Sequence, residues 1–148
     1  MSAPFMRLIE PGLEARIRRH LEAQYPAEGC GVLIGGGDGT AVPWEIADIV
    51  PAPNHHGGDR ARRYLIPPEL QLQAERAASA RGLDVVGFYH SHPDHPARPS
   101  EHDRELAWPG YVYAICAVAK GVSAEMESFT LNEAGEFVEV AAPDHSAQ

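Results

Sequence analysis

Residues 83–89 restrict the fold of this chain more than any other stretch of its sequence. Their β-branched and aromatic side chains, which directly follow Gly82, predict a buried strand. The strand runs without a break into residues 90–102, which contain four of the eight histidines of the chain. The sequence therefore predicts a sheet in which one buried strand ends at a cluster of histidines.

Further strands and helices are predicted on both sides of this strand. Helices are expected from Pro11 to just before Pro26, over residues 67–82, and from Ser100 to near Pro109. The run 30–34 ends at three consecutive glycines and should form a hairpin with 44–50, with a loop over 51–59. The remaining strands are expected at residues 6–10, 63–66, 111–119, 122–131 and 137–140. The whole is predicted to be an α/β domain with a mixed sheet.

The length of the chain fits one domain. With 148 residues, 44% of them hydrophobic, it can bury one core of ordinary size. No stretch repeats at a fixed period, and no low-complexity linker interrupts the chain. We expect a domain over residues 1–140 and a flexible C-terminal tail over 141–148.

Composition argues against two classes of partner. A net charge of −9 disfavours nucleic acid, although Arg60, Arg62 and Arg63 form a small basic patch. The apolar runs are far shorter than the ~20 residues of a membrane-spanning helix, and residues 1–10 do not resemble a signal peptide. We therefore expect no membrane partner and a cytoplasmic protein. The two cysteines, Cys30 and Cys116, lie in apolar stretches and are expected to be buried thiols.

The segment His90-Ser91-His92-Pro93 has the features of a metal site. Side chains two apart on a strand point to the same face, so His90 and His92 can converge on one ion. Pro93 ends the pairing of the strand, and the following loop can turn the chain back. A carboxylate on the next helix, Asp103, can then supply a third ligand.

Three nitrogen and oxygen ligands leave a fourth position for water, which is typical of catalytic zinc. The attacking water needs a proton acceptor that later protonates the leaving group, and a carboxylate outside the ligand set suits this role. Glu28 lies between a predicted helix and the apolar run 30–34, so its side chain could enter such a cleft.

Ser100 has two interpretations that can both hold. Ser followed by an acid three residues later is a helix N-cap, and a serine hydroxyl can also donate to a developing oxyanion. His95 and His102 are candidate ligands by residue type. We expect them to be solvated or to lie outside the ligand set, because His95 is in a proline-flanked loop and His102 points along another helix face.

These residues together resemble the JAMM (MPN-plus) metallopeptidases. The family pattern is an upstream Glu, then His-x-His-Pro, and Ser-x-x-Asp some six residues later, and the resemblance covers roughly residues 5–130. It implies a single MPN-like domain with a curved mixed sheet flanked by helices. It also implies zinc ligands His90, His92 and Asp103, with Glu28 as general acid/base and Ser100 as oxyanion donor.

The resemblance also implies a class of substrate. The chain is similar to the short bacterial members, which suggests cleavage of a peptide or isopeptide bond at the C-terminal tail of a ubiquitin-like sulfur-carrier protein. An extended Gly-Gly tail could thread a groove and pair with a sheet edge. Its candidate walls are residues 51–63 and 94–99. Two alternatives remain open: a non-catalytic MPN interaction module, and a zinc hydrolase of small-molecule amides.

Overall fold

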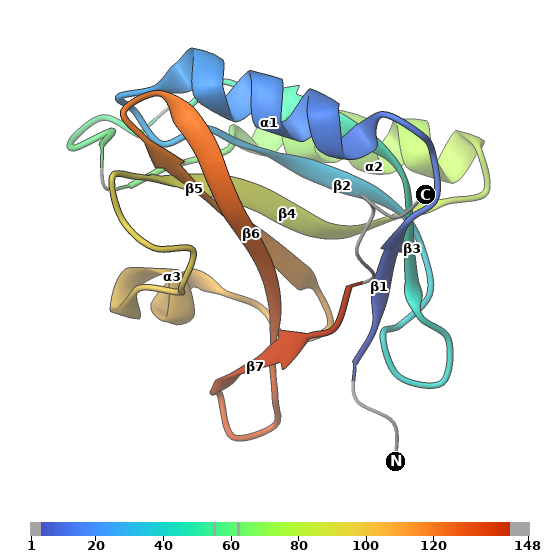
Figure 1. The fold of residues 1–148 in the computed structure, drawn as a ribbon. Helices are drawn as coiled ribbons and strands as arrows, with labels where there is room; N and C mark the ends of the chain where they lie inside the picture. The colour runs from blue at the N-terminus through green and yellow to red at the C-terminus, as the bar shows by residue number, and fades with distance from the viewer. Residues whose placement is uncertain (1–3, 55, 62, 143–148) are drawn as a thin grey trace.

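All strands of the protein join one curved, mixed sheet, which the computed structural model shows for residues 4–54, 56–61 and 63–142 (Figure 1). The elements in chain order are β1 (Met6–Leu8), α1 (Leu13–Gln24), β2 (Cys30–Gly36), β3 (Trp44–Ala52), α2 (Pro68–Ala80), β4 (Asp84–Pro93), α3 (Glu101–Leu106), β5 (Val112–Ala119), β6 (Val122–Leu131) and β7 (Phe137–Val140). The order in the sheet is β1-β3-β2-β4-β5-β6-β7, with β4 in the centre. The predicted α/β class and the predicted hairpin of β2 and β3 are confirmed.

The central strands β4 and β5 are parallel, and their connection determines where the site can form. A parallel pair needs a crossover between its two strands. Here the crossover leaves β4 at Pro93, passes through α3 and returns to β5, which pairs Gly87 with Val112 and Pro93 with Val118. The helix α3 therefore lies apart from the two longer helices in Figure 1. The crossover brings α3 back near the end of β4.

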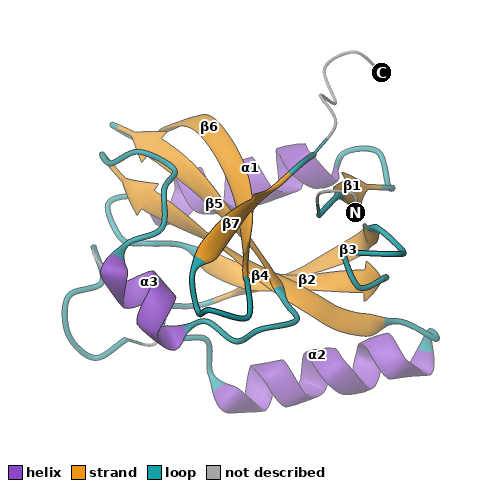
Figure 2. Cartoon of the chain, turned by 90° about the horizontal axis from the view of Figure 1, so that it is seen from below, coloured by secondary structure: helices purple, strands orange, loops and turns teal. Residues whose placement is uncertain are grey.

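Helices α1 and α2 cover opposite faces of the sheet (Figure 2). The apolar face of α1, formed by Leu13, Ile17 and Leu21, packs in one core cluster with Leu33 of β2. The small residues Ala74 and Ala78 of α2 pack in a second cluster with alternate residues of β2, namely Cys30, Val32 and Ile34. Because β2 is buried on both faces, its sequence is a continuous apolar run instead of an alternating one.

Gly31 of β2 leaves room for the ring of Tyr89 on the neighbouring strand β4. A Cβ atom at Gly31 would lie 2.2 Å from the ring of Tyr89, so no larger residue fits without movement. The neighbouring pair in the register is Cys30 with His90. This register brings the start of β2, and the residues just before it, next to His90.

The strand predicted at residues 63–66 is wrong, because these residues form a loop. The side chain of Asn54 hydrogen-bonds the carbonyl of Arg63 at 2.8 Å and the amide of Leu65 at 3.1 Å. These backbone groups are therefore used by a side chain and not by a neighbouring strand. Several strand boundaries also differ from the prediction: β1 ends at Leu8, β2 continues to Gly36 and β3 continues to Ala52. The strand β4 continues through both histidines because β5 pairs with it as far as Pro93.

Both ends of the described chain meet at the outer strands. Ala141 accepts a hydrogen bond from the amide of Met6 and donates one to the carbonyl of Pro4, both at 2.9 Å. Residues 143–148 of the predicted tail lie outside the described residues, so the boundary at 140 stays a prediction. Both cysteines are free and buried, as expected. None of the helices in the described part of the chain is long and apolar enough to cross a bilayer.

Candidate active site

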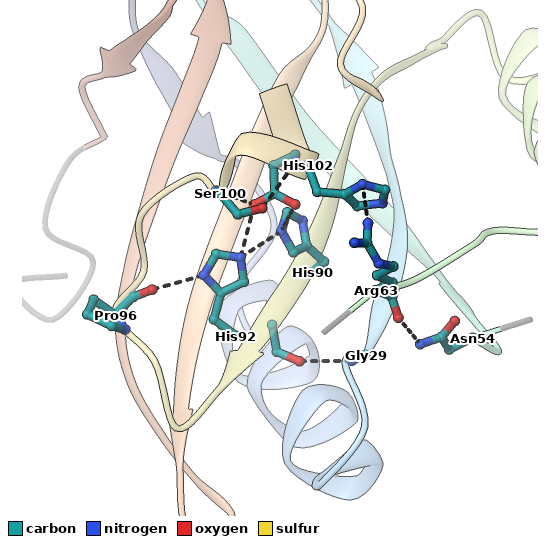
Figure 3. Close-up of polar contacts among 10 residues, drawn as sticks. Gly29, Asn54, Arg63, His90, His92, Pro96, Ser100 and His102 are labelled. Carbon is teal, nitrogen blue, oxygen red and sulfur yellow. Dashed lines mark hydrogen bonds and ion pairs between the residues drawn. The ribbon is translucent and has the colours of Figure 1, made fainter. Parts of the chain in front are cut away.

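The side chains of His90, His92 and Asp103 converge at the end of β4 (Figure 3). The two histidine Nε2 atoms are 3.3 Å apart. One oxygen of Asp103 lies 3.0 Å from Nε2 of His92, and the other lies 3.3 Å from Nε2 of His90. These atoms come from a strand and from the helix after it, as the sequence predicted. The three residues fit a metal site.

The N-terminal cap of α3 fixes the carboxylate of Asp103. Ser100 accepts a hydrogen bond through Oγ from the amide of Asp103 at 3.0 Å, and its own amide donates to Oδ2 of Asp103 at 2.9 Å. This reciprocal pair is a capping box. The spacing Ser-x-x-Asp therefore does two things: it starts the helix, and it turns one oxygen of the acid toward the histidines.

Hydrogen bonds around the histidines set their orientation and charge. Nδ1 of His92 lies 2.9 Å from the carbonyl of Pro96, which leaves Nε2 facing the carboxylate. Burial alone would raise the pKa of Asp103, but hydrogen bonds from both histidines hold this pKa well below its usual range. Burial lowers the pKa of His90, whose ring stacks on Tyr64 with centroids 4.6 Å apart. In His92, burial lowers the pKa, but the hydrogen bonds to Asp103 and Pro96, together with the nearby acids Asp103 and Glu28, outweigh burial and raise the pKa.

Glu28 is the second acid of the site and lies in a different environment. Only 4% of its surface is exposed, and its Oε1 atom has no hydrogen-bond partner among the described residues. Burial raises the pKa of this carboxyl to about 8. The residue lines the same cavity as His92 and Ser100. A buried carboxylic acid that titrates near neutral pH is suited to exchange protons with a substrate.

A cavity of about 530 Å³ connects these groups, and both predicted walls contribute to it. Ala61 comes from the first loop, and His95, Pro96 and Arg98 come from the second. His95 is exposed, as expected. His102 lies outside the ligand group and contacts the guanidinium of Arg63.

The predicted basic patch is partly engaged within the protein. Arg60 donates to the carbonyl of His56 at 3.1 Å, and Arg63 contacts His102. Arg62 lies outside the described residues. An electrostatic role of this patch toward a substrate stays a prediction.

Comparison with known families agrees with this geometry. The model of a family described as prokaryotic homologs of the JAB domain, Prok-JAB, matches residues 10–132. The chain belongs to this family. The resemblance drawn from the sequence motif is therefore confirmed.

Two relatives of this Prok-JAB domain carry names that state an activity. The chain is 44% identical over 93 residues to a protein of Haloferax volcanii named "Desampylase", an alignment that covers 62% of this chain and 63% of the relative. It is 36% identical over 98 residues to a Thermus thermophilus protein named "Probable TtuB-protein conjugate cleaving protease", with 66% and 61% covered. The chain thus spans less than two thirds of the length of each relative.

Solved structures share the Prok-JAB fold seen here. A protein from Desulfitobacterium hafniense has a TM-score of 0.77 at 26% identity, with 95% of this chain and 94% of that chain covered. A protein from Salinibacter ruber has a TM-score of 0.69 at 36% identity, with 95% and 92% covered. A JAB1/MPN domain protein from Archaeoglobus fulgidus has a TM-score of 0.57 at 20% identity, with 97% and 100% covered, which supports the fold alone.

Sequence reasoning missed three residues that support this Prok-JAB site. Ser91, between the two histidines, accepts a hydrogen bond from the amide of Gly29 at 2.8 Å and donates its own amide to the carbonyl of Gly29 at 3.0 Å. It thereby links the histidine strand to the residue after Glu28. Tyr64 stacks on His90, and Asn54 bonds the backbone around Glu28. The serine could have been noticed between the histidines. The other two lie far from the motif in sequence and carried no signal.

Proposed function

We propose that this protein is a zinc-dependent hydrolase that cleaves a peptide or isopeptide bond at the C-terminal tail of a ubiquitin-like sulfur-carrier protein. One observation carries the proposal: Glu28, a buried acid with a raised pKa and one oxygen without a hydrogen-bond partner among the described residues, lines the same cavity as His92 of the His-His-Asp group. The names of the two relatives support the reaction and the class of substrate.

The donor set supports zinc as the metal. Two imidazole nitrogens and one carboxylate oxygen are common zinc ligands in catalytic sites. The donor separations of 3.0–3.3 Å are close to the ~3.3 Å edge of a tetrahedron with bonds of about 2 Å. His90, His92 and Asp103 would hold the ion. When bound, zinc supplies a Lewis acid and lowers the pKa of a coordinated water.

Glu28 would move the proton in the reaction. Its ionised carboxylate accepts a proton from the attacking water and passes that proton to the nitrogen of the leaving group. Both steps require a pKa near the working pH, and burial gives this carboxyl a pKa of about 8. No described residue hydrogen-bonds its Oε1 atom, so this oxygen is available to a proton.

Ser100 would stabilise the charge that develops on the carbonyl oxygen of the scissile bond. Its Oγ accepts from the amide of Asp103, which leaves the proton of the hydroxyl free to donate. The residue lines the cavity beside Glu28. The cap and the oxyanion contact therefore use different parts of one hydroxyl group.

The shape of the site supports a thin, extended substrate. The cavity lies between two loops at the end of the central strand, where a glycine-rich tail with small side chains would fit. The outer strands of the sheet are β1 and β7, so backbone pairing of a bound tail would involve the segments around the cavity and not an outer edge. A sulfur carrier that ends in Gly-Gly meets these requirements.

The decisive experiment compares zinc-loaded and metal-free protein. Each is incubated with ubiquitin-like carriers that bear C-terminal extensions or are conjugated to a lysine, and the products are measured by intact mass. We expect release of the extension or the conjugate only with metal. Bound zinc without cleavage of any amide would favour an interaction module, and cleavage of small amides alone would favour a small-molecule hydrolase.

A further inference from the structure

We propose that Asn54 is a positioning residue that places the carboxylate of Glu28 in the site. This inference rests on the proposed function, because it assumes that Glu28 transfers the proton. It adds a residue from a separate loop to the residues that the motif provides.

Asn54 uses both ends of its side-chain amide. Nδ2 donates to the carbonyl of Glu28 at 3.1 Å and to the carbonyl of Arg63 at 2.8 Å. Oδ1 accepts from the amide of His56 at 3.0 Å and from the amide of Leu65 at 3.1 Å. One side chain therefore closes the loop of residues 54–65 on itself and attaches it to the backbone of Glu28.

The same loop holds the other backbone group of Glu28. The amide of Glu28 donates to the carbonyl of Arg60 at 2.6 Å. Both backbone polar groups of this residue are thus bonded to residues 54–60. The loop is also attached on its far side, because Arg63 contacts His102 of α3 (Figure 3). It therefore spans the distance between the acid and the helix that carries Asp103.

The position of the acid depends on this attachment because no described residue holds the Oε1 atom of its side chain by a hydrogen bond. The backbone therefore sets where the carboxylate lies. A displacement of about 1 Å in a reacting group can cost about 10²-fold in rate. Losing the Asn54 contacts should allow such a displacement while His90, His92 and Asp103 keep their places.

The test uses two variants of Asn54 and a matched control. Asn54→Ala removes all the side-chain bonds, and Asn54→Asp keeps an acceptor for the two amides but loses the donor to Glu28. Asn132→Ala is the control, because Asn132 also accepts two amide hydrogen bonds, at 2.9 Å and 3.0 Å, in the turn between β6 and β7. We expect both Asn54 variants to lower kcat about 10–100-fold with zinc content unchanged. Asn132→Ala should keep kcat within about twofold. If Asn54→Ala does not fold, Asn54→Asp carries the test.

A double-mutant cycle separates positioning from a general structural role. In a Glu28→Gln background, Asn54→Ala and Asn54→Asp should cause no further loss of kcat, because they act through a group that is already removed. Equal losses in both backgrounds would overturn the proposal. If wild-type protein cleaves no conjugate, or Glu28→Gln is as active as wild type, then the proposed function fails instead.

Hydrogen exchange tests the inference independently of activity. The amide of Glu28, which bonds Arg60, should exchange at least tenfold faster in Asn54→Ala and Asn54→Asp than in wild type. The amides of β4 should be unaffected, and Asn132→Ala should change only its own turn. Unchanged exchange of the Glu28 amide in both Asn54 variants would overturn the proposal.

Discussion

The two acids of the site, Asp103 and Glu28, are held in opposite ways. On the ligand side, formed by His90, His92 and Asp103, the acid receives hydrogen bonds from two histidines and from the cap of its helix. On the base side, formed by Glu28 and the described residues of the loop 54–65, the acid is buried, and one of its oxygens has no hydrogen-bond partner in the part of the chain that the structure describes. The pKa of Asp103 is held low, and that of Glu28 is raised to about 8.

This difference shows how two carboxyl groups in one site can serve different roles. A carboxylate that is always ionised can remain bound to a cation, whereas one that titrates near neutral pH can accept and release protons. The contrast comes from hydrogen bonds on one side and from their absence on the other, among the described residues. The following predictions test each side separately.

Removing the titratable group of the base side should have the largest effect. Glu28→Gln keeps the shape of the side chain but cannot carry the proton, so we expect kcat to fall by about 10²–10⁴-fold. Zinc content, measured by mass spectrometry of metals, should stay at the wild-type level. Turnover close to wild type would show that the two sides do not differ in role.

Ser100 caps the helix that carries Asp103 and lines the same cavity as Glu28, and the loss of its hydroxyl should have the next largest effect. Ser100→Ala and Ser100→Gly both remove the donor, so each should lower kcat by about 10²–10³-fold. Loss of the cap should cost about 1 kcal/mol in free energy of unfolding for Ala and only about a few tenths for Gly. Rates and urea unfolding are measured together. If kcat fell only in proportion to the loss of stability in the two variants, and not with the loss of the hydroxyl, then capping the helix would be the only role of Ser100.

Removing the carboxylate of Asp103 should affect metal binding more than any other property. Asp103→Ala removes one ligand, and we expect zinc affinity to fall by about 10²-fold, since even indirect supports of a metal site can cost that much. Competition with a chelator of known affinity measures it. The control is Glu28→Gln, which should retain zinc. An Asp103→Ala protein that binds zinc as tightly as wild type would exclude Asp103 from the ligand set.

The smallest effect is a change in stability with pH on the base side. In metal-free protein, the raised pKa of Glu28 means that the unfolded chain loses this proton first as pH rises from about 4.5 toward about 8. Wild type therefore loses stability over this range and Glu28→Gln does not, so the variant should be the more stable of the two at pH 9 and should differ little from wild type at pH 4.5. Urea unfolding at both pH values checks the sign.

A reversed result would contradict the contrast between the two acids. Asp103 has a lowered pKa, so its contribution to stability is present above its unfolded pKa and is lost as pH falls. If Glu28→Gln lost stability relative to wild type at pH 9, the carboxyl of Glu28 would behave like that of Asp103 and would be paired.

The convergence of His90, His92 and Asp103 could be predicted almost completely from the sequence. Its residues lie within fourteen positions, from His90 to Asp103, and each is placed by a local rule. Alternation along a strand puts His90 and His92 on one face, and the cap of α3 orients Asp103. The sequence also predicted both long helices and the β2–β3 hairpin, because periodicity and turn residues are local signals.

The base side was decided by tertiary structure. The sequence suggested Glu28 as the base, but the loop that holds it was partly predicted as a strand at residues 63–66. Bonds from Asn54 to Glu28 and Leu65 join positions 26 and 11 residues apart, and the stack of Tyr64 on His90 also joins separate segments. The periodicity of the sequence gives no signal for such pairs, because they depend on how the sheet curves and how the loops return to it. Local order thus determined the arrangement of the His-His-Asp group, and long-range packing determined the environment of Glu28.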